Sequence, residues 1–266
     1  MQNEIEKITV LRLTKEGRSN VEEVFVRERP VTIILNDQEL VTMLCSPTNL
    51  EYLAVGFLSS EGFLRSKDEI KKLLVDYQRG VVRVDTGENK EFAQDILFKR
   101  LITSGCGRGA SFYSAADATS QKVESQMEIS TDEVFALVNE FQHSSEVYLA
   151  TRGVHSAALC DRGSILVFSE DIGRHNAIDK IFGKCLLEDI PTDDRVVITS
   201  GRISSEILHK VAKRGIPIII SISAPTNLGV RIADNLGVTL ISSVRGKRMN
   251  VCTNDWRVVP KTGISG

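Results

Sequence analysis

One cysteine of this chain lies in a short stretch rich in glycine. Residues 104–109 read Ser-Gly-Cys-Gly-Arg-Gly, so glycines flank Cys106 and Arg108 follows two residues later. Glycine leaves the backbone open and permits positive φ angles, which favours an approachable loop. A guanidinium and unpaired backbone N–H groups favour the thiolate, which is the form that accepts sulfur. The pattern indicates a reactive thiol; the alternative is an ordinary free cysteine, which is usually a small buried apolar residue.

Two turns in the second half of the chain combine hydroxyl groups with glycine or proline, and the first of them also holds a cation. Ser200, Gly201 and Arg202 stand between a predicted strand and a predicted helix, and residues 223–227 repeat the arrangement as Ser-Ala-Pro-Thr-Asn. A helix N-terminus attracts anions, so residues 200–202 are candidates for an anion site. The simpler interpretation is a helix capped by Ser200 beside a surface arginine.

A third turn holds a cluster of cations after the last predicted strand of the same region. Its residues are Ser243, Val244, Arg245, Gly246, Lys247 and Arg248. Charged runs are usually solvated surface, but open α/β sheets bind ligands at the edge that these three turns share. Together they predict a site for a diphosphate, held by Arg and Lys side chains and by helix dipoles. His155 and His175 lie near the same predicted edge, and the sequence leaves their roles open.

Length and composition exclude several classes of function. The chain has 266 residues, of which 42% are hydrophobic and 26% are charged, as is typical of a soluble globular protein. A formal net charge of −2 and a pI near 6.1 argue against general binding to nucleic acid or to acidic membranes. Residues 1–17 mix acids with bases, and the longest apolar run, residues 216–222, is too short to cross a bilayer. We therefore expect neither a signal peptide nor a spanning helix.

The cysteines are five in number and widely scattered, and no C-x-x-C motif occurs among them. This pattern suits the reducing cytoplasm better than a disulfide framework or a structural zinc site. We expect a cytoplasmic protein that holds no metal through its own side chains. The five are Cys45, Cys106, Cys160, Cys185 and Cys252.

The first part of the chain predicts a small α+β subdomain over residues 1–95. Polar residues between two apolar runs predict a hairpin, and Thr48-x-x-Glu51 has the pattern of a capping box that begins a helix. The predicted elements are strands 31–35 and 40–45, a helix after Thr48, a short helix over 66–74 and a strand over 81–85.

The second part, residues 96–266, predicts an α/β domain that carries the cysteine loop. Ser130-x-x-Glu133 is a second capping-box pattern, and strands and helices then alternate at short spacing. Such alternation predicts parallel strands covered by helices. The predicted strands are 147–151, 154–160, 165–169, 195–199, 216–222 and 238–244, and the predicted helices after the capping box are 176–187, 203–213 and 227–236.

Several segments resemble one known family. They include TRGVHSAAL, SEDIGRHNAIDK, SGRISSE, SISAPTNL and VRGK, together with the earlier ERPVTIILN and SPTNLEYLAVGFLSSEGFL. In this order, and over nearly the whole chain, they resemble the formate dehydrogenase accessory sulfurtransferases of the FdhD/NarQ family. The resemblance implies an α/β fold with a cytidine-deaminase-like three-layer core, and a homodimer.

The resemblance also implies a function. A member of this family accepts persulfide sulfur from a cysteine desulfurase and transfers it to the molybdenum (or tungsten) bis-molybdopterin guanine dinucleotide, its substrate, which is then inserted into formate dehydrogenase. Cys106 is by resemblance the persulfide carrier, and residues 243–248 correspond to the family's cofactor-binding segment. The implied partners are therefore a cysteine desulfurase, formate dehydrogenase and the guanine dinucleotide cofactor, without nucleic acid or membrane.

The chain departs from the family pattern in the cysteine loop. The family loop commonly reads C-G-x-C-G, whereas Gly109 stands at the second cysteine position here. A relay through Cys106 alone remains open, and so does a chaperone that binds the guanine dinucleotide cofactor without moving sulfur. A zinc hydrolase acting on a nucleobase needs H-x-E and P-C-x-x-C, but Ser156 and Ala157 follow His155.

Overall fold

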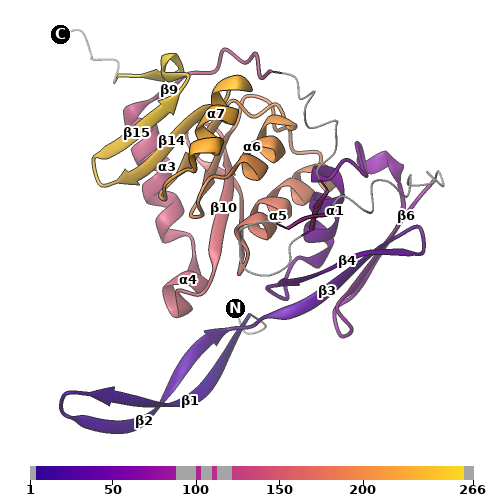
Figure 1. The fold of residues 1–266 in the computed structure, drawn as a ribbon, viewed down its shortest axis with the longest axis vertical. Coiled ribbons are helices and arrows are strands. Elements are labelled where there is room, and N and C mark those ends of the chain that lie inside the picture. Colours follow the sequence, from indigo (N-terminus) through magenta and orange to yellow (C-terminus); the bar gives the residue numbers. More distant parts are fainter. Residues whose placement is uncertain (1–3, 88–99, 103–109, 113–121, 261–266) are drawn as a thin grey trace.

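The N-terminal strands form a long hairpin that projects from the rest of the molecule (Figure 1). This computed structural model describes residues 4–87, 100–102, 110–112 and 122–260. Strands β1 (Ile5–Thr14) and β2 (Gly17–Val26) pair along their full length, and the side chain of Leu13 near the tip is 70% exposed. The sequence did not predict this hairpin because apolar and charged residues share both of its faces.

A four-stranded sheet packed on one helix follows the hairpin. The strands β3 (Arg29–Leu35), β4 (Gln38–Cys45), β5 (Ile70–Asp76) and β6 (Val81–Thr86) stand in the order β4-β3-β6-β5, and helix α1 (Leu50–Ser60) covers one face. The predicted hairpin of β3 and β4 and the predicted strand β6 are confirmed. The boundary of a subdomain at residue 95 stays a prediction.

Two predicted details of this region are wrong. Helix α1 is preceded by Asn49 at φ 54° without a side-chain cap, and the Thr48 hydroxyl donates to the Glu4 carboxylate at 3.0 Å, so it ties the loop to the N-terminal segment. The predicted helix over 66–74 is a single 3₁₀ turn (Lys67–Glu69), capped by Ser66, and then strand β5. Strand β5 pairs with β6 from Ile70 to Asp76, with one register shift between Ile70 and Lys72, and this pairing overrides local helix propensity.

The larger sheet has six strands and confirms the predicted parallel core. Strands β12 (Val196–Thr199), β13 (Ile218–Ser221) and β14 (Thr239–Arg245) are parallel to one another, and the order is β11-β10-β12-β13-β14-β15. The remaining strands, β10 (His155–Cys160), β11 (Ile165–Asp171) and β15 (Arg248–Thr253), join as antiparallel neighbours.

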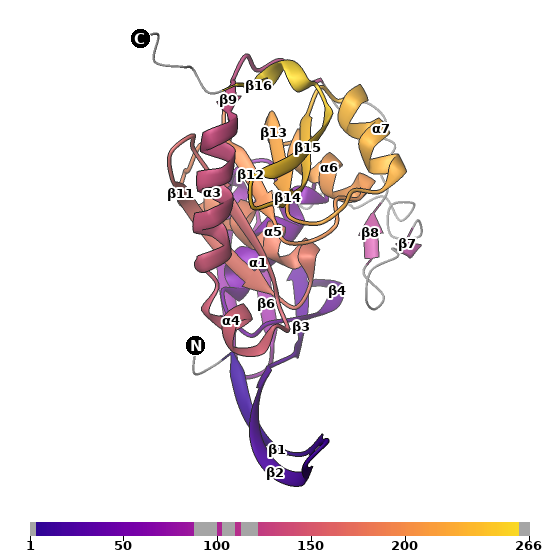
Figure 2. The ribbon, with the colours of Figure 1, turned by 90° about the vertical axis from the view of Figure 1, so that its left-hand side faces the viewer.

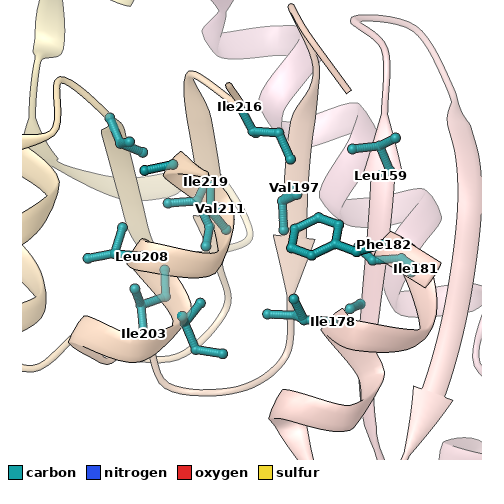
Figure 3. Packing of buried hydrophobic residues seen from close by; sticks show 14 of the residues in the cluster. Leu159, Ile178, Ile181, Phe182, Val197, Ile203, Leu208, Val211, Ile216 and Ile219 are labelled. Carbon is teal, nitrogen blue, oxygen red and sulfur yellow. The ribbon is translucent and has the colours of Figure 1, made fainter. Parts of the chain in front are cut away.

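Helices cover both faces of this sheet, so the domain has three layers (Figure 2). Helix α3 (Thr131–His143) covers one face, and α5 (Arg174–Leu187), α6 (Ser205–Ala212) and α7 (Asn227–Asn235) cover the other. Alternate residues of each strand enter the two cores: Ile198 faces α3, while Val197 lies among the side chains of α5 and α6 (Figure 3). The three-layer arrangement is present, and its description as cytidine-deaminase-like stays a prediction.

The beginning and end of the domain are fixed by short elements. The capping box of α3 is confirmed, since the Ser130 hydroxyl accepts from the Glu133 amide and the Glu133 carboxylate accepts from the Ser130 amide. Strand β9 (Ile129–Ser130) pairs with β16 (Val258–Val259) after the 3₁₀ turn Asp255–Arg257, and β7 (Arg100–Ile102) pairs with β8 (Ala110–Phe112). None of the helices in the described ranges has the length and apolarity needed to cross a bilayer.

One predicted strand, residues 147–151, is instead the short helix α4 (Glu146–Thr151). Val147 and Tyr148 favour a strand locally, but the Ser145 hydroxyl accepts a hydrogen bond from the Tyr148 amide and so caps the first turn. The helix ends at Arg152, which adopts the left-handed conformation with φ 53°.

Helices α1 and α5 cross so closely that only glycine fits at the contact. A Cβ atom on Gly56 would lie 1.8 Å from the Asp179 carbonyl oxygen, and one on Gly183 would lie 1.8 Å from the Tyr52 carbonyl oxygen. Such distances are far below van der Waals contact, so the backbones of the two helices touch directly. This crossing joins the smaller sheet to the larger one.

Two buried ion pairs stand beside the crossing. Lys180 and Asp171 are 2.7 Å apart and fully buried, and the Ser46 amide donates to the Asp171 carboxylate at 3.0 Å. Lys210 lies 2.6 Å from Asp179, whose carboxylate also accepts from the Ser60 hydroxyl at 2.7 Å. Each pair therefore binds a residue of the N-terminal part to helix α5.

We expect Gly183→Ala to destabilise the protein by about 3 kcal/mol or more, because the new Cβ overlaps backbone that cannot move without separating α1 from α5. Chemical denaturation measures the change in free energy of unfolding. Gly163→Ala is the control, since its Cβ would meet only the Asp161 carboxylate at 3.7 Å, and a change within about 0.5 kcal/mol is expected. Equal effects of the two substitutions would contradict the close crossing.

Candidate functional site

The topology brings four chain segments to one edge of the larger sheet. The parallel strands β12, β13 and β14 end there, and β10 begins there because it runs antiparallel to β12. Backbone hydrogen bonds join the loops to neighbouring strands: the Ser200 amide donates to the Ser156 carbonyl of β10 at 3.0 Å, and the Ser243 amide of β14 donates to the Ser223 carbonyl at 3.1 Å. His155 is the first residue of β10. The predicted common edge is therefore confirmed.

Ser200 does not begin or cap a helix, so that part of the prediction is wrong, while its place in an anion site stays a prediction. Helix α6 begins at Ser205, with Ser204 as its N-cap, so residues 200–202 form a loop and not a helix N-terminus. The Ser200 hydroxyl accepts from the Ser156 amide at 2.9 Å and lies 3.3 Å from His155 Nδ1. Ser200 therefore joins two strands and contacts the imidazole.

Gly201 and Arg202 contribute to this edge in unlike ways. Gly201 is buried, and a Cβ at this position would lie 2.7 Å from the Arg174 Cβ, so glycine lets the arginine pack over the loop. The Ser221 hydroxyl donates to the Gly201 carbonyl at 2.8 Å and fixes the loop against β13. Arg202 is exposed and available to a ligand.

The two histidines of this edge have lowered pKa values. Burial is the main cause for His155, and the positive charges of Arg174 and Arg202 add to it. Burial also lowers the pKa of His175, although a Glu206 carboxylate oxygen 3.0 Å from Nε2 opposes the shift. His155 is therefore a neutral imidazole at neutral pH, surrounded by cations that favour an anionic ligand.

A cavity of about 450 Å³ opens beside His155, between the sheet edge and helices α3 and α4. Local sequence patterns do not predict this cavity, because its outer wall is α4, whose residues favour a strand locally. Its lining residues are Phe141, Gln142, Ser145, Tyr148, Arg152, Gly153, Val154, His155, Ser156, Ile172, Ser200 and Ile222.

Two other hollows, of about 500 and 800 Å³, lie at the opposite end of β12. Each of them has three acidic and two basic residues in its lining, whereas the cavity beside His155 is lined by Arg152 and by no acidic residue, so that cavity suits an anion better. In the described part of the chain, no group of three or more His, Cys, Asp and Glu side chains is placed to hold a metal ion.

The cationic turn closes the hairpin of β14 and β15. Arg245, Lys247 and Arg248 are exposed, and Gly246 has a φ of 57°. The strand bulges just before the turn, between Ser242 and Arg245, where the pairing with β15 shifts register. Three cations thus extend from the same edge as the cavity.

The two residues that precede these cations belong to the fold. Ser243 has a φ of 54°, and its amide donates to the neighbouring loop. The Val244 side chain is only 1% exposed and lies in the core under α3. Val244 can therefore reach a ligand only through its backbone.

Three of the described cysteines are poor sulfur acceptors, whereas Cys106, Arg108 and Gly109 lie outside the described residues. Burial raises the pKa of Cys45 and Cys160 to about 12 and that of Cys185 to about 11, so these remain thiols at neutral pH. Cys252 is half-buried, with its sulfur 3.3 Å from the Ser242 hydroxyl.

We expect the His155 imidazole to titrate below pH 6.5, because burial and nearby cations disfavour its protonated form. NMR titration of ring protons, assigned by loss of the signal in His155→Gln, measures this pKa. The folded-state pKa lies below that of the unfolded chain, so protonation favours unfolding. The parent should therefore lose stability relative to His155→Gln as the pH falls below about 6.5. A titration midpoint above 6.5 would contradict this environment.

Comparison with known proteins gives matches over nearly the whole chain. Residues 26–259 match the profile of the FdhD/NarQ family. A Bacillus subtilis (strain 168) protein named sulfur carrier protein FdhD is 44% identical over 241 residues, covering 90% of this chain and 92% of its own. The protein of the same name from Bacillus pumilus is 41% identical over 261 residues, covering 97% and 99%.

A solved structure is also similar. The crystal structure of a putative formate dehydrogenase accessory protein from Desulfotalea psychrophila superimposes with a TM-score of 0.80 at 28% sequence identity. The match covers 96% of this chain and all of that one, so the two chains share their fold over nearly their full lengths.

Proposed function

Because this chain belongs to the FdhD/NarQ family, we propose that it is a sulfur carrier required for formate dehydrogenase activity. It accepts persulfide sulfur from a cysteine desulfurase on Cys106 and transfers it to the molybdenum (or tungsten) bis-molybdopterin guanine dinucleotide, its substrate. The names of its relatives support the carrier role, and the Desulfotalea psychrophila structure supports an accessory role toward formate dehydrogenase. A cytoplasmic homodimer remains our expectation.

The observation that carries this proposal is the state of the other cysteines. Cys45, Cys160 and Cys185 are buried with raised pKa values, so an incoming persulfide cannot reach a thiolate there. Cys252 is half-buried, and its side chain packs against the main hydrophobic core. Cys106, with its glycine neighbours and Arg108, is the cysteine whose surroundings in sequence favour a thiolate.

Loading of Cys106 is a balanced exchange. The Cys106 thiolate attacks the outer sulfur of the desulfurase persulfide and forms a new S–S bond. The old S–S bond breaks, and its electron pair leaves with the desulfurase cysteine as a thiolate. No external oxidant or reductant is needed, because the outer sulfur keeps its oxidation state.

The edge of the larger sheet supplies the substrate site in this proposal. The guanine dinucleotide arms of the substrate carry diphosphates, and the formal net charge of the protein is only −2, so binding depends on local cations. Arg245, Lys247 and Arg248 are exposed at this edge, and Arg202 is exposed on the loop after β12. Charge-assisted hydrogen bonds from these groups hold the phosphates.

Incubation with a cysteine desulfurase and cysteine should add one sulfur atom to Cys106, seen by mass spectrometry as a species that reducing thiols remove. Cys106→Ser should take up none at this site, because it lacks the nucleophile. Cys252→Ser is the matched control and should load like the parent. Full loading of Cys106→Ser would exclude Cys106 as the carrier.

Formate dehydrogenase activity in cells lacking their own accessory protein distinguishes the carrier from the cofactor-binding chaperone. Gly109 in place of a second loop cysteine is the observation that favours the chaperone. We expect Cys106→Ser to restore little or no activity, while the parent restores it. Activity restored fully by Cys106→Ser would favour the chaperone, and Gly109→Cys shows whether a second thiol improves transfer.

Replacing Arg245 and Lys247 with Ala should weaken binding of GDP by about 1.5–3 kcal/mol, or about tenfold or more, through loss of charge-assisted hydrogen bonds. Calorimetry measures the dissociation constant. The matched control is Lys15→Ala with Arg18→Ala, because these two exposed cations flank Gly17 in the tip of the projecting hairpin. If the two double variants bind GDP with equal affinity, the cationic turn is not part of the binding site.

A further inference from the structure

Strand β1 leaves one long edge of the projecting hairpin open. Figures 1 and 2 show the hairpin clear of both sheets, and within the described ranges β1 pairs with no strand except β2. Helix α4 packs against β2, so the edge of β1 is the more accessible of the two. The ladder of β1 and β2 has no bulge, and neither strand contains proline. Such a flat edge is a template for a further strand.

Alternate residues of β1 direct their backbone groups to this edge. The Arg27 amide donates to the Glu4 carbonyl at 2.7 Å, so Glu4 and Arg27 form a hydrogen-bonded pair at the base of the hairpin. Bonded and non-bonded pairs alternate along an antiparallel ladder, so the even-numbered residues of β1 bond to β2. The residues whose N–H and C=O groups point to the open edge are Ile5, Lys7, Thr9, Leu11 and Leu13.

The sequence of β1 is complementary to itself when two copies run antiparallel with Thr9 opposite the partner's Thr9. In this register Glu6 lies opposite the partner's Arg12, and Ile8 lies opposite the partner's Val10. The register pairs odd-numbered residues with odd-numbered ones, so the outward backbone groups of one copy meet those of the other. Opposite charges and apolar residues directly across a sheet both stabilise the pairing of its strands.

The same register covers apolar side chains that a single chain leaves in water. Leu13 is 70% exposed and lies opposite the partner's Ile5. Leu11 is 55% exposed and lies opposite the partner's Lys7, whose aliphatic stem offers apolar surface. A two-stranded hairpin is marginally stable in water, whereas three or more strands with an apolar face form a stable sheet.

Charges of alternating sign also cross this contact. Arg12 forms an ion pair with Glu23 of its own hairpin, and Glu6 lies 3.7 Å from Arg27. With two copies paired, Glu23 and Arg12 are followed by Glu6 and Arg27 of the partner subunit. Exposed pairs of this kind add little affinity, but they select one register over its neighbours.

We propose that β1 binds β1 of a second copy of this chain, with Thr9 at the twofold axis, so that the two hairpins form one antiparallel sheet of four strands. Such an interface is isologous, because the same edge serves both copies and each contact occurs twice. The proposed function leaves the contact surface between copies open, and this assignment does not rest on sulfur transfer.

Cross-linking of Thr9→Cys tests the twofold pairing. Directly opposite residues in such a sheet have Cα atoms about 5.5 Å apart, which suits a disulfide. Oxidation of dilute protein should convert most of Thr9→Cys to a covalent dimer on non-reducing gels. Ser19→Cys is the matched control and should form little covalent dimer, because it is exposed on β2, away from the axis. Both variants carry Cys106→Ser, so that the loop thiol does not react between chains. Equal cross-linking of the two would overturn the proposal.

Charge reversal tests the register, with the dimer dissociation constant measured by analytical ultracentrifugation. Arg12→Glu puts like charges opposite one another twice in each dimer, so the constant should rise about tenfold or more. Glu6→Arg combined with Arg12→Glu restores opposite charges and should return it to within about threefold of the parent. Glu22→Arg is the control, since it reverses a charge on β2 that faces no residue of the partner, and it should stay within about twofold.

Three results would overturn this assignment: a parent that sediments as a monomer, a dissociation constant unchanged in Arg12→Glu, or a double variant as weak as Arg12→Glu. Thermal unfolding checks that each variant is folded. Normal persulfide loading of Cys106 in a monomeric parent would refute the strand contact alone. A cross-linked Thr9→Cys dimer together with full activity of Cys106→Ser in cells would refute sulfur transfer alone.

Discussion

The rest of the structure depends on the direct backbone contact between α1 and α5 at Gly56 and Gly183. At this separation Ser46 and Ser60 reach the buried carboxylates of Asp171 and Asp179. Buried charges without such partners are strongly destabilising, so the crossing and the two ion pairs require one another. The Asp171 carboxylate also accepts from the Gly173 amide at 2.9 Å, which holds the first turn of α5 against the sheet edge.

That first turn of α5 links the core to the chemistry of the edge. Arg174 packs over Gly201, and His175 contacts Glu206, so α5 positions the charges that surround His155. The edge is positive although the chain has a net charge of only −2. Recognition of phosphates therefore depends on where this chain places a few cations, and not on its overall charge.

Sequence patterns predicted the elements whose apolar residues repeat over several turns or strands, including α3, α5 and the parallel strands. The structure of short elements depends on contacts that no local pattern reveals. The Ser145 cap stabilises a helix over residues 146–151, and pairing with β6 stabilises a strand over residues 70–76. The cations of the turn were found from charge alone, but the cavity was missed because its wall is that helix. The predicted N-cap role of Ser200 is wrong because α6 begins at Ser205, with Ser204 as its N-cap, and not directly after residues 200–202.

The projecting hairpin has a consequence for amide hydrogen exchange. A two-stranded ribbon with little buried apolar surface is marginally stable by itself, and Leu11 and Leu13 near its tip remain largely exposed. Its base is better anchored, since Glu4 accepts from the Arg27 amide and the Thr48 hydroxyl. Amides at the tip therefore exchange with solvent through local opening, at a small fraction of the global free energy of unfolding, while those of β12 and β13 exchange only when the whole domain unfolds.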